Sequence, residues 1–414
     1  MKSAQWRRVK VKANALFIVV TVSFVVALIL FGFLTIGGVF AKAETEFAIR
    51  NKLVRNVKSG LQFCLAADEL PEKFVVDLFQ EGTDSVLFES FPFGLLTQVK
   101  VSAFHAQDTV YKYFVLGNHS LAQSKTALYL ANSNKALGVC GHVKLNGDVF
   151  VPERGVERVY IEGQNFVGAQ LYSGRKSISK SLLPPLHPNI RSNIERAFEM
   201  QEGKLFDTEK DSVISGDHPL VFSFPTGISV GAVVKGNVTI ISSEFIHVQA
   251  DAQLENTILR APVIKVEKGF KGSIQAFATD SLIVEENCDL RFPSALVLKA
   301  RKNTDFSTKL VVGSSCKVAG NIVLLQERFR LKNNGIITIN NNVLVNGSIY
   351  SEAYTQLKSC EIQGEVYTKK LFLKTRSSIY ENTLLNVGID PAKKERDMVD
   401  LGINNSERSW VFVQ

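Results

Sequence analysis

The pattern of apolar positions begins with an uninterrupted run close to the N-terminus. No residue from Ala13 to Ala41 is charged, and Val, Leu, Ile and Phe predominate. A helix rises about 1.5 Å per residue, and about 20 apolar residues span a bilayer, so this segment is long enough to cross a membrane. The pattern predicts a transmembrane helix over residues 13–41.

The spacing of apolar positions then changes twice. Residues at helical spacing, with basic residues between them, are Phe47, Leu53, Val57, Leu61 and Leu65. Strand-like runs separated by turn-prone segments follow at 74–79, 85–90, 95–104 and 109–117. We expect a small membrane-proximal α+β domain over residues 42–125, in which an antiparallel meander packs against an amphipathic helix.

A short phrase recurs along the rest of the chain: an apolar residue, any residue, glycine, a polar residue and a second apolar residue. Its glycines are Gly147, Gly236, Gly272, Gly320, Gly347 and Gly364. Successive side chains of a strand face opposite sides, so both apolar residues and the glycine should point inward. The polar residues that follow the glycines should face solvent; they are Asp148, Asn237, Ser273, Asn321, Ser348 and Glu365.

The intervals between these glycines predict stacked coils. They are 89, 36, 48, 27 and 17 residues, and the intervals of 17 and 36 correspond to one and two coils of about 18 residues. An inward glycine marks a tight bend or a close backbone approach, which stacked coils require. The pattern predicts a mainly β protein with a parallel β-solenoid over residues 220–385 and its first coil or coils within 126–219. The intervals of 27 and 48 predict looped-out segments, such as residues 326–335.

Two segments depart from this pattern. Ile190, Ile194 and Phe198 predict a short amphipathic helix, ended by Gly203, that forms an excursion or a cap. Residues 386–414 are polar until a final strand-like "SWVFV". We expect them to cap the open end of the solenoid, because an uncovered sheet edge promotes aggregation.

The distribution of charge predicts the location of the chain. The sequence has 48 basic and 40 acidic residues, but residues 1–42 contain six basic residues and no acidic one. The remainder is nearly balanced, which excludes a nucleic-acid-binding surface. By the positive-inside rule, residues 1–12 form a cytoplasmic tail, and the bulk lies outside the inner membrane, in the periplasm. A cleaved signal peptide is the alternative, but its apolar region is normally about 7–15 residues.

The glycine-centred phrase resembles bactofilins, the polymer-forming bacterial β-solenoid proteins. The stretch "TALYLANSNKALGVCGHVKLNGDVFVPERGVERVYIEGQNFVG" is similar to uncharacterised single-pass envelope proteins of Bacteroidetes. The order of membrane helix, amphipathic helix and antiparallel sheet resembles type IV pilins and pseudopilins as an architectural analogy only. Pilins carry a glutamate inside the apolar segment, whereas the first acidic residue here is Glu44.

Metal-binding motifs are absent from the sequence. The six histidines lie far apart, and neither HExxH, CxxC nor a phosphate-binding glycine motif occurs. The five cysteines are too few and too dispersed for a disulfide framework, and we expect Cys316 and Cys360 to be small core residues. We predict no cofactor and no metal.

One cluster of carboxylates offers an alternative. Asp280, Glu285, Glu286 and Asp289 fall within "TDSLIVEENCDL" and could supply an acid and a base. If they converge in an open groove beside exposed aromatic residues such as Phe277 and Tyr350, the solenoid binds or cleaves a polysaccharide. Otherwise they are turn and outer-face residues that keep a coil soluble.

The sequence therefore predicts a non-enzymatic, membrane-anchored scaffold. Its stiff β surface would bind partner proteins or further copies of the chain within an envelope, secretion or pilus-like assembly. The polysaccharide-acting solenoid is the alternative function.

Overall fold

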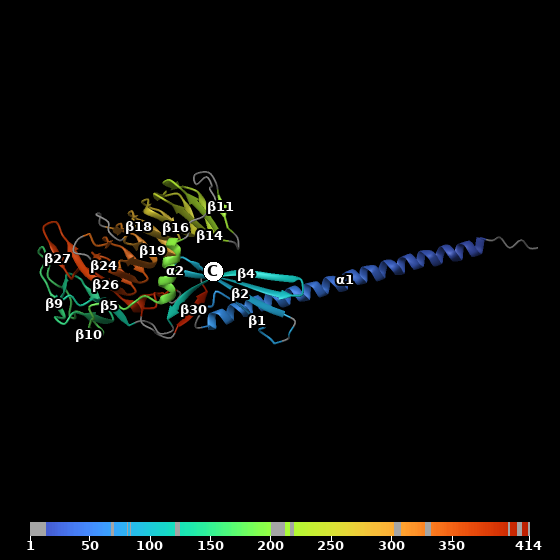
Figure 1. Ribbon diagram of the computed structural model, residues 1–414, viewed down its shortest axis with the longest axis horizontal. Helices are drawn as coiled ribbons and strands as arrows, with labels where there is room; N and C mark the ends of the chain where they lie inside the picture. Colours follow the sequence, from blue (N-terminus) through green and yellow to red (C-terminus); the bar gives the residue numbers. More distant parts are fainter. Residues whose placement is uncertain are drawn as a thin grey trace, which may run out of the picture.

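A long helix, α1 (Asn14–Ala66), projects from a body that consists mainly of β-structure (Figure 1). The computed structural model describes residues 14–67, 70–80, 82, 84–120, 125–199, 212–215, 219–301, 308–327, 333–395, 398–403 and 408–412. The basic tail predicted over residues 1–12 and the helix end predicted at Gly203 lie outside these residues.

Helix α1 contains both predicted helical segments without a break. Its 53 residues correspond to about 80 Å at 1.5 Å per residue. The apolar side chains from Leu16 to Phe40 are exposed, and among the described residues this is the one helix long and apolar enough to span a membrane. The second half of the helix is amphipathic, and Leu53, Val57 and Cys64 are buried.

The amphipathic half of α1 packs on an antiparallel sheet, as predicted. The sheet has the order β1-β2-β3-β4-β30. Its strands are β1 (Lys73–Val76), β2 (Asp84–Phe93), β3 (Leu96–His105), β4 (Asp108–Ser120) and β30 (Arg408–Phe412). Leu53 and Val57 share a core with Val101 and Phe114 of this N-terminal sheet. Strand β2 continues to Phe93, so the segment predicted as a turn at 91–94 begins as strand.

The prediction that residues 386–414 cap the solenoid is wrong. Strand β30 pairs antiparallel with β4, so that Trp410 lies opposite Asn118. The C-terminal segment thus supplies the fifth strand of the N-terminal sheet. A strand can satisfy its backbone hydrogen bonds at any uncovered edge, and the sequence pattern does not identify which edge it will use.

The remaining strands form the β-solenoid, in which strands of neighbouring coils pair in parallel. The strands before helix α2 (Pro188–Glu199) are β5 (Thr126–Leu130), β6 (Leu137–Cys140), β7 (Lys144–Leu145), β8 (Asp148–Val151), β9 (Val156–Arg158) and β10 (Lys176–Ile178). Those after it, up to the middle of the solenoid, are β11 (Val213–Ile214), β12 (Leu220–Phe224), β13 (Ile228–Val230), β14 (Val233–Ser242), β15 (Phe245–Val248), β16 (Gln253–Val266), β17 (Lys271–Gly272), β18 (Ile274–Val284) and β19 (Asp289–Lys299). The last group is β20 (Lys309–Val312), β21 (Lys317–Leu325), β22 (Ile336–Ile339), β23 (Leu344–Asn346), β24 (Ile349–Leu357), β25 (Glu361–Gln363), β26 (Val366–Lys374), β27 (Ile379–Glu381), β28 (Thr383–Leu385) and β29 (Gly388–Ile389), followed by the 3-10 helix η1 (Pro391–Lys393).

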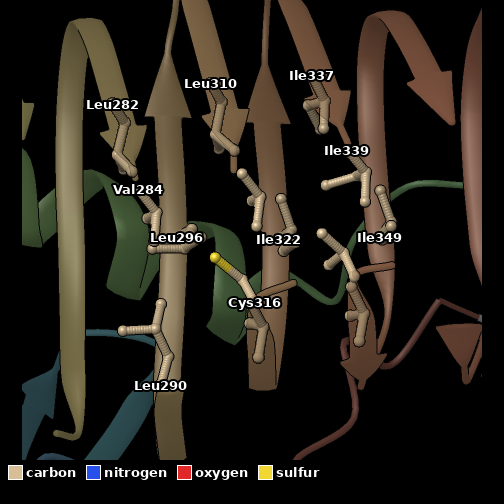
Figure 2. Packing of buried hydrophobic residues seen from close by; sticks show 14 of the residues in the cluster. Leu282, Val284, Leu290, Leu296, Leu310, Cys316, Ile322, Ile337, Ile339 and Ile349 are labelled. Atoms are coloured by element: carbon tan, nitrogen blue, oxygen red, sulfur yellow. The ribbon is translucent and has the colours of Figure 1, made fainter. Parts of the chain in front are cut away.

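Identical positions of successive coils form columns of apolar side chains inside the solenoid. Figure 2 shows Leu282, Leu310 and Ile337 in one column, and their strands pair in that register. The predicted spacing of 18 residues is confirmed where Val266 pairs with Val284. Coils that contain an excursion are longer, because Ile322 pairs with Ile349, 27 residues later. The excursion predicted at 326–335 is closed at its base by the Gln326 side chain, which bonds Asn334 and the Gly335 amide.

The order of the coils in space differs from their order in sequence. Strand β5 pairs with β26, and β7 pairs with β29, so the coil built by residues 126–151 stacks on the last coil of the 220–385 region. Strand β10 stacks beyond it on β8, whereas β12 and β13 stand at the opposite end. The predicted first coil is therefore not followed by the 220–385 region. In sequence, helix α2 lies between β10 and β12, which stand at opposite ends of the solenoid. In space, α2 lies along the side of the solenoid (Figure 1).

Five of the six predicted glycines occupy one corner of the coils. Val318, Val345 and Ile362 pair in register, which aligns the glycines two residues after them. A Cβ on Gly347 would overlap the carbonyl of Gly320, and one on Gly364 would overlap that of Gly347. The corner glycines thus permit a close approach of neighbouring coils, and their missing side chain would point along the stack and not into the core.

Gly272 is the exception among the six. It pairs with Leu290 and therefore occupies the column of inward apolar residues, two positions before the corner. A Cβ at Gly272 would overlap the Leu254 carbonyl at 2.5 Å and the ring of Phe270 at 2.7 Å. The sequence around Gly272 matches the glycine-centred phrase, but its glycine lies two positions earlier in the coil than the other five.

A second core lies outside the solenoid, between one of its faces and helix α2. Outward residues of successive coils form a column that contains Arg260, Phe277, Val297, Val323, Tyr350, Tyr367 and Tyr129. Ile190 and Ile194 of α2 pack on this column together with Leu95 and Leu96 of the N-terminal sheet and Leu401. The solenoid and the N-terminal sheet thus share one core.

Candidate functional site

The four predicted carboxylates do not form an acid–base pair in a groove. The Glu285 carboxylate lies 2.8 Å from Lys265 Nζ, and the Glu286 carboxylate lies 3.1 Å from Lys268 Nζ. The hydrogen bond from Lys265 lowers the pKa of Glu285 below its usual range. Asp289 lies at the start of β19, opposite Lys271 and Lys317 of the neighbouring coils. These three residues belong to the charged outer surface of the coils.

Asp280 is separated from the other three by the buried strand segment Leu282–Val284. Its carboxylate Oδ1 lies 3.0 Å from Nε of Arg301. The same Arg301 nitrogen donates a hydrogen bond to the Thr279 hydroxyl at 3.1 Å. Asp280 therefore holds the guanidinium of Arg301 next to Thr279.

The aromatic residues named with the carboxylates are not exposed. Phe277 and Tyr350 point outward from the coils, but both are buried beneath helix α2. The Tyr350 hydroxyl donates a hydrogen bond to the carbonyl of Pro184, and the Phe277 ring packs edge-on against Phe198. The condition set for the polysaccharide alternative at these carboxylates is therefore not met, because helix α2 covers both aromatic residues.

A groove does open beside the end of this covered column. We call it the α2 groove; its volume is about 800 Å³. One wall is the face of α2 that carries Arg191, Glu195 and Phe198, at spacings of four and three residues. The floor and opposite wall come from seven successive coils, from Ser223 at one end to Glu352 at the other. Sequence patterns could not predict this groove, because helix α2 and the strands opposite it come from separate segments of the chain.

Basic side chains dominate the middle of the α2 groove. Lys299 Nζ lies 5.5 Å from the centre of the Phe198 ring. Arg301 follows Lys299 on the same coil, and Arg260 lines the groove two coils away. Burial lowers the pKa of Arg260, which stands between Ile241 and Phe277 in the outward column. Such partly desolvated cations interact more strongly with an anion than cations in open solvent do.

The acidic side chains of the groove lie toward its Glu352 end, with Glu327 and Glu352 on the last two coils and Glu195 on α2. Arg191 lies 3.5 Å from the carboxylate of Glu195 and 3.4 Å from that of Glu352. Burial raises the pKa of Glu352, although its carboxylate accepts a hydrogen bond from the Gln326 amide at 2.7 Å. At one end of the groove, Arg191 is therefore paired with Glu195 and Glu352, whereas the stretch around Lys299 is more basic.

The polar residues that follow the corner glycines are largely buried, contrary to expectation. Asn321, Ser348 and Glu365 are at most 3% exposed, because residues 391–395 and 398–403 lie over this row. The Asn321 side chain donates to the carbonyl of Val399 at 3.1 Å and accepts from the Ser348 amide at 2.9 Å. This row of polar residues binds the C-terminal segment on its way to β30.

A charged cluster joins α1 to the N-terminal sheet. Asp84 is buried, and its carboxylate contacts His105 Nδ1 at 2.6 Å, Lys52 Nζ at 3.0 Å and Asn56 Nδ2 at 3.0 Å. Burial by itself raises the pKa of Asp84, but the hydrogen bonds from His105, Lys52 and Asn56 outweigh it and lower the pKa to about 2. We call these four residues the Asp84 cluster; it connects elements and lines none of the larger grooves.

The cysteines are buried and unpaired. Cys316 and Cys360 lie inside the solenoid, which confirms their prediction as core residues, and burial raises the pKa of Cys360 to about 12. Within the described part of the chain, no group of three or more His, Cys, Asp or Glu side chains is arranged to hold a metal ion.

Comparison with known proteins gives no relative: no family model, no curated protein and no solved structure matches this chain.

Proposed function

We propose that this chain is a membrane-anchored structural and interaction protein of the cell envelope. Helix α1 crosses the inner membrane with the basic tail in the cytoplasm. The solenoid stands outside the membrane and presents its surface to partner proteins or to further copies of the chain.

The observation that carries this proposal is the continuity between the apolar half of α1 and the body. The helix passes without interruption from exposed apolar residues into the core beneath β3 and β4. The turn after β2 is then bound to the solenoid, because the Leu95 amide donates to the Gln275 side chain at 2.8 Å and Gln275 donates to the Phe93 carbonyl at 3.2 Å. An anchor connected in this way holds the solenoid at a fixed height and orientation, which favours binding between proteins of fixed geometry.

The proposed topology is tested by labelling introduced cysteines in intact cells. The five native cysteines are buried, so a membrane-impermeant maleimide should react with an exposed substitute such as Arg376→Cys. Ser3→Cys in the basic tail should react only after the membrane is permeabilised. The reverse pattern would overturn the orientation.

Partner binding is tested by photo-cross-linking from the surface of the solenoid. A photoreactive residue at Lys309 or Lys317, both exposed, should give discrete adducts with another protein or a second copy of the chain. The same residue at Leu310, which points into the core, measures the background. Equal patterns from the exposed and the interior positions would refute a scaffold that works through this surface.

A further inference from the structure

The α2 groove has the dimensions of a site for a linear polymer. Its floor crosses seven coils, and six steps of about 4.8 Å between paired strands give a length of about 29 Å. Its volume of about 800 Å³ is in the range of ligand-binding clefts. The groove runs beside α2 along the axis of the solenoid, so each coil contributes a similar position to its floor.

The backbone of the coils limits which polymer fits. Amide and carbonyl groups of the coils bond to the next coil along the axis, as in the register of Ala261 with Ala278. Along the paired parts of these strands, few backbone groups are therefore available to an extended peptide, which would otherwise bind by adding a strand. The groove recognises its ligand mainly through side chains, among them the hydroxyls of Ser223, Ser243 and Thr279. Hydroxyl, guanidinium and carboxylate side chains match the hydroxyl groups of a sugar chain.

The charge of the groove indicates the kind of sugar. Among the described residues, no carboxylate lies within 4.0 Å of the Lys299 ammonium, which rests over the Phe198 ring. Arg260 lies one coil from Thr279, and the position of Arg301 is fixed by Asp280. Arg260, Lys299 and Arg301 therefore face the middle of the groove, and its acidic lining residues, Glu327, Glu195 and Glu352, lie toward one end. This stretch fits the carboxylates of an acidic sugar.

We propose that the α2 groove binds a linear acidic glycan, with Arg260, Lys299 and Arg301 contacting its carboxylates. Arg191 and Glu195 of α2 form the polar wall along which the chain lies. Asp280 is a positioning residue, because it acts through Arg301 and does not line the groove. This site goes beyond the scaffold function.

The proposal is tested by isothermal titration of the full chain in detergent micelles with uronic acid oligosaccharides of two, four and six units. Probes are oligogalacturonate, oligomannuronate and hyaluronan. We expect at least one series to bind, with a hexasaccharide at least tenfold tighter than its disaccharide, because only the longer chain crosses the cationic coils. Affinity should fall as salt is raised from 50 to 300 mM.

Variants identify the groove as the site. Lys299→Ala and Arg260→Ala should each weaken hexasaccharide binding at least tenfold, and Lys299, being at the surface, can be changed without loss of the fold. Lys393→Ala is the matched control, because Lys393 forms a 3.0 Å ion pair with Glu361 on another face. Asp280→Asn should weaken binding less than Lys299→Ala.

Three results would overturn the proposal. The first is that none of the acidic series binds. The second is that maltohexaose or hexaglutamate binds as tightly as the acidic hexasaccharide, which would replace the acidic glycan by a neutral glycan or a peptide. The third is that Lys393→Ala weakens binding as much as Lys299→Ala does, which would place the site elsewhere.

Discussion

Backbone conformation at single residues determines where each coil turns. The corner glycines have neighbouring backbone on the side where a Cβ would lie, and Gly347 has φ of 146°. A second corner consists of residues with left-handed φ near 55°, among them Asn287, Ser315, Asn342 and Ser359. Asn tolerates this conformation better than most other non-glycine residues. The coil thus uses glycine where backbones approach and asparagine or serine where only the left-handed turn is required.

Substitution at a corner glycine tests this distinction. Gly347→Ala should lower the free energy of unfolding by about 2–4 kcal/mol, because the new methyl overlaps the Gly320 carbonyl and the backbone of neighbouring coils must shift. Gly388→Ala is the control, since its Cβ would be 3.7 Å from the nearest atom and its φ is not left-handed. Melting of the full chain in detergent, followed by circular dichroism, measures both. Equal melting temperatures would contradict the explanation.

Alternation along the strands was enough to predict which residues point into the solenoid. Ile337, Ile339 and Val345 are all buried in the interior, as their parity predicts. The second corner was missed, although Ser315, Asn342 and Ser359 each stand five residues before a corner glycine. Burial of Asn321 and Ser348 could not be predicted, because Val399 and Lys394 from a segment distant in sequence cover them, and strand parity carries no information about distant segments.

At the scale of elements, the order in which the coils stack and the position of the last strand differ most from the prediction. Local patterns identified α1, α2 and the first four strands of the N-terminal sheet, since each depends on periodicity within one segment. The stacking of β5 on β26 and the pairing of β30 with β4 join strands more than 230 residues apart. Every coil offers a similar apolar face and a similar backbone edge, so the pattern does not specify which coil follows which. The α2 groove, which these connections create, was missed for the same reason.

The Asp84 cluster makes the junction of α1 with the N-terminal sheet sensitive to acid. The pKa of Asp84 is about 2 in the folded chain, against 3.8 for the unperturbed group, so its ionised form stabilises the junction by about 2 kcal/mol at neutral pH. This contribution is present above about pH 4 and is lost as the pH falls towards 2. Asp84→Asn should therefore open residues 49–66 to hydrogen exchange at pH 7, and the difference from the native chain should shrink below pH 4.

The control for this prediction is Glu46→Gln. Glu46 forms an exposed ion pair with Lys42 at 3.8 Å on the same helix, and pairs of this kind contribute little. Its exchange rates should match those of the native chain at both pH values. If Asp84→Asn kept the same difference from the native chain at pH 7 and below pH 3, the ionised carboxylate would not be the cause.

At the scale of the whole molecule, helix α1 is firmly connected to the N-terminal sheet, and this sheet shares a core with the solenoid. Helix α1 enters the N-terminal sheet, the turn after β2 binds Gln275, and the C-terminal segment returns from the solenoid to β4. The sheet and the solenoid are therefore tied together by the two ends of the chain. An applied displacement of the anchor would move the solenoid as a body.

Interrupting α1 between the apolar segment and the sheet tests this rigidity. Fluorescent labels at Ala41→Cys and Arg376→Cys, both exposed, report the distance from the end of the apolar segment to the solenoid in nanodiscs. Single-molecule energy transfer should give one narrow distribution for the native helix and a broad one for Glu44→Pro, because proline removes a helical hydrogen bond and costs about 3 kcal/mol in a helix interior. Glu44→Ala keeps the helix and should leave the distribution narrow. A broad distribution in the native chain would mean that the anchor does not orient the solenoid, and the fixed-geometry argument for the scaffold would fail.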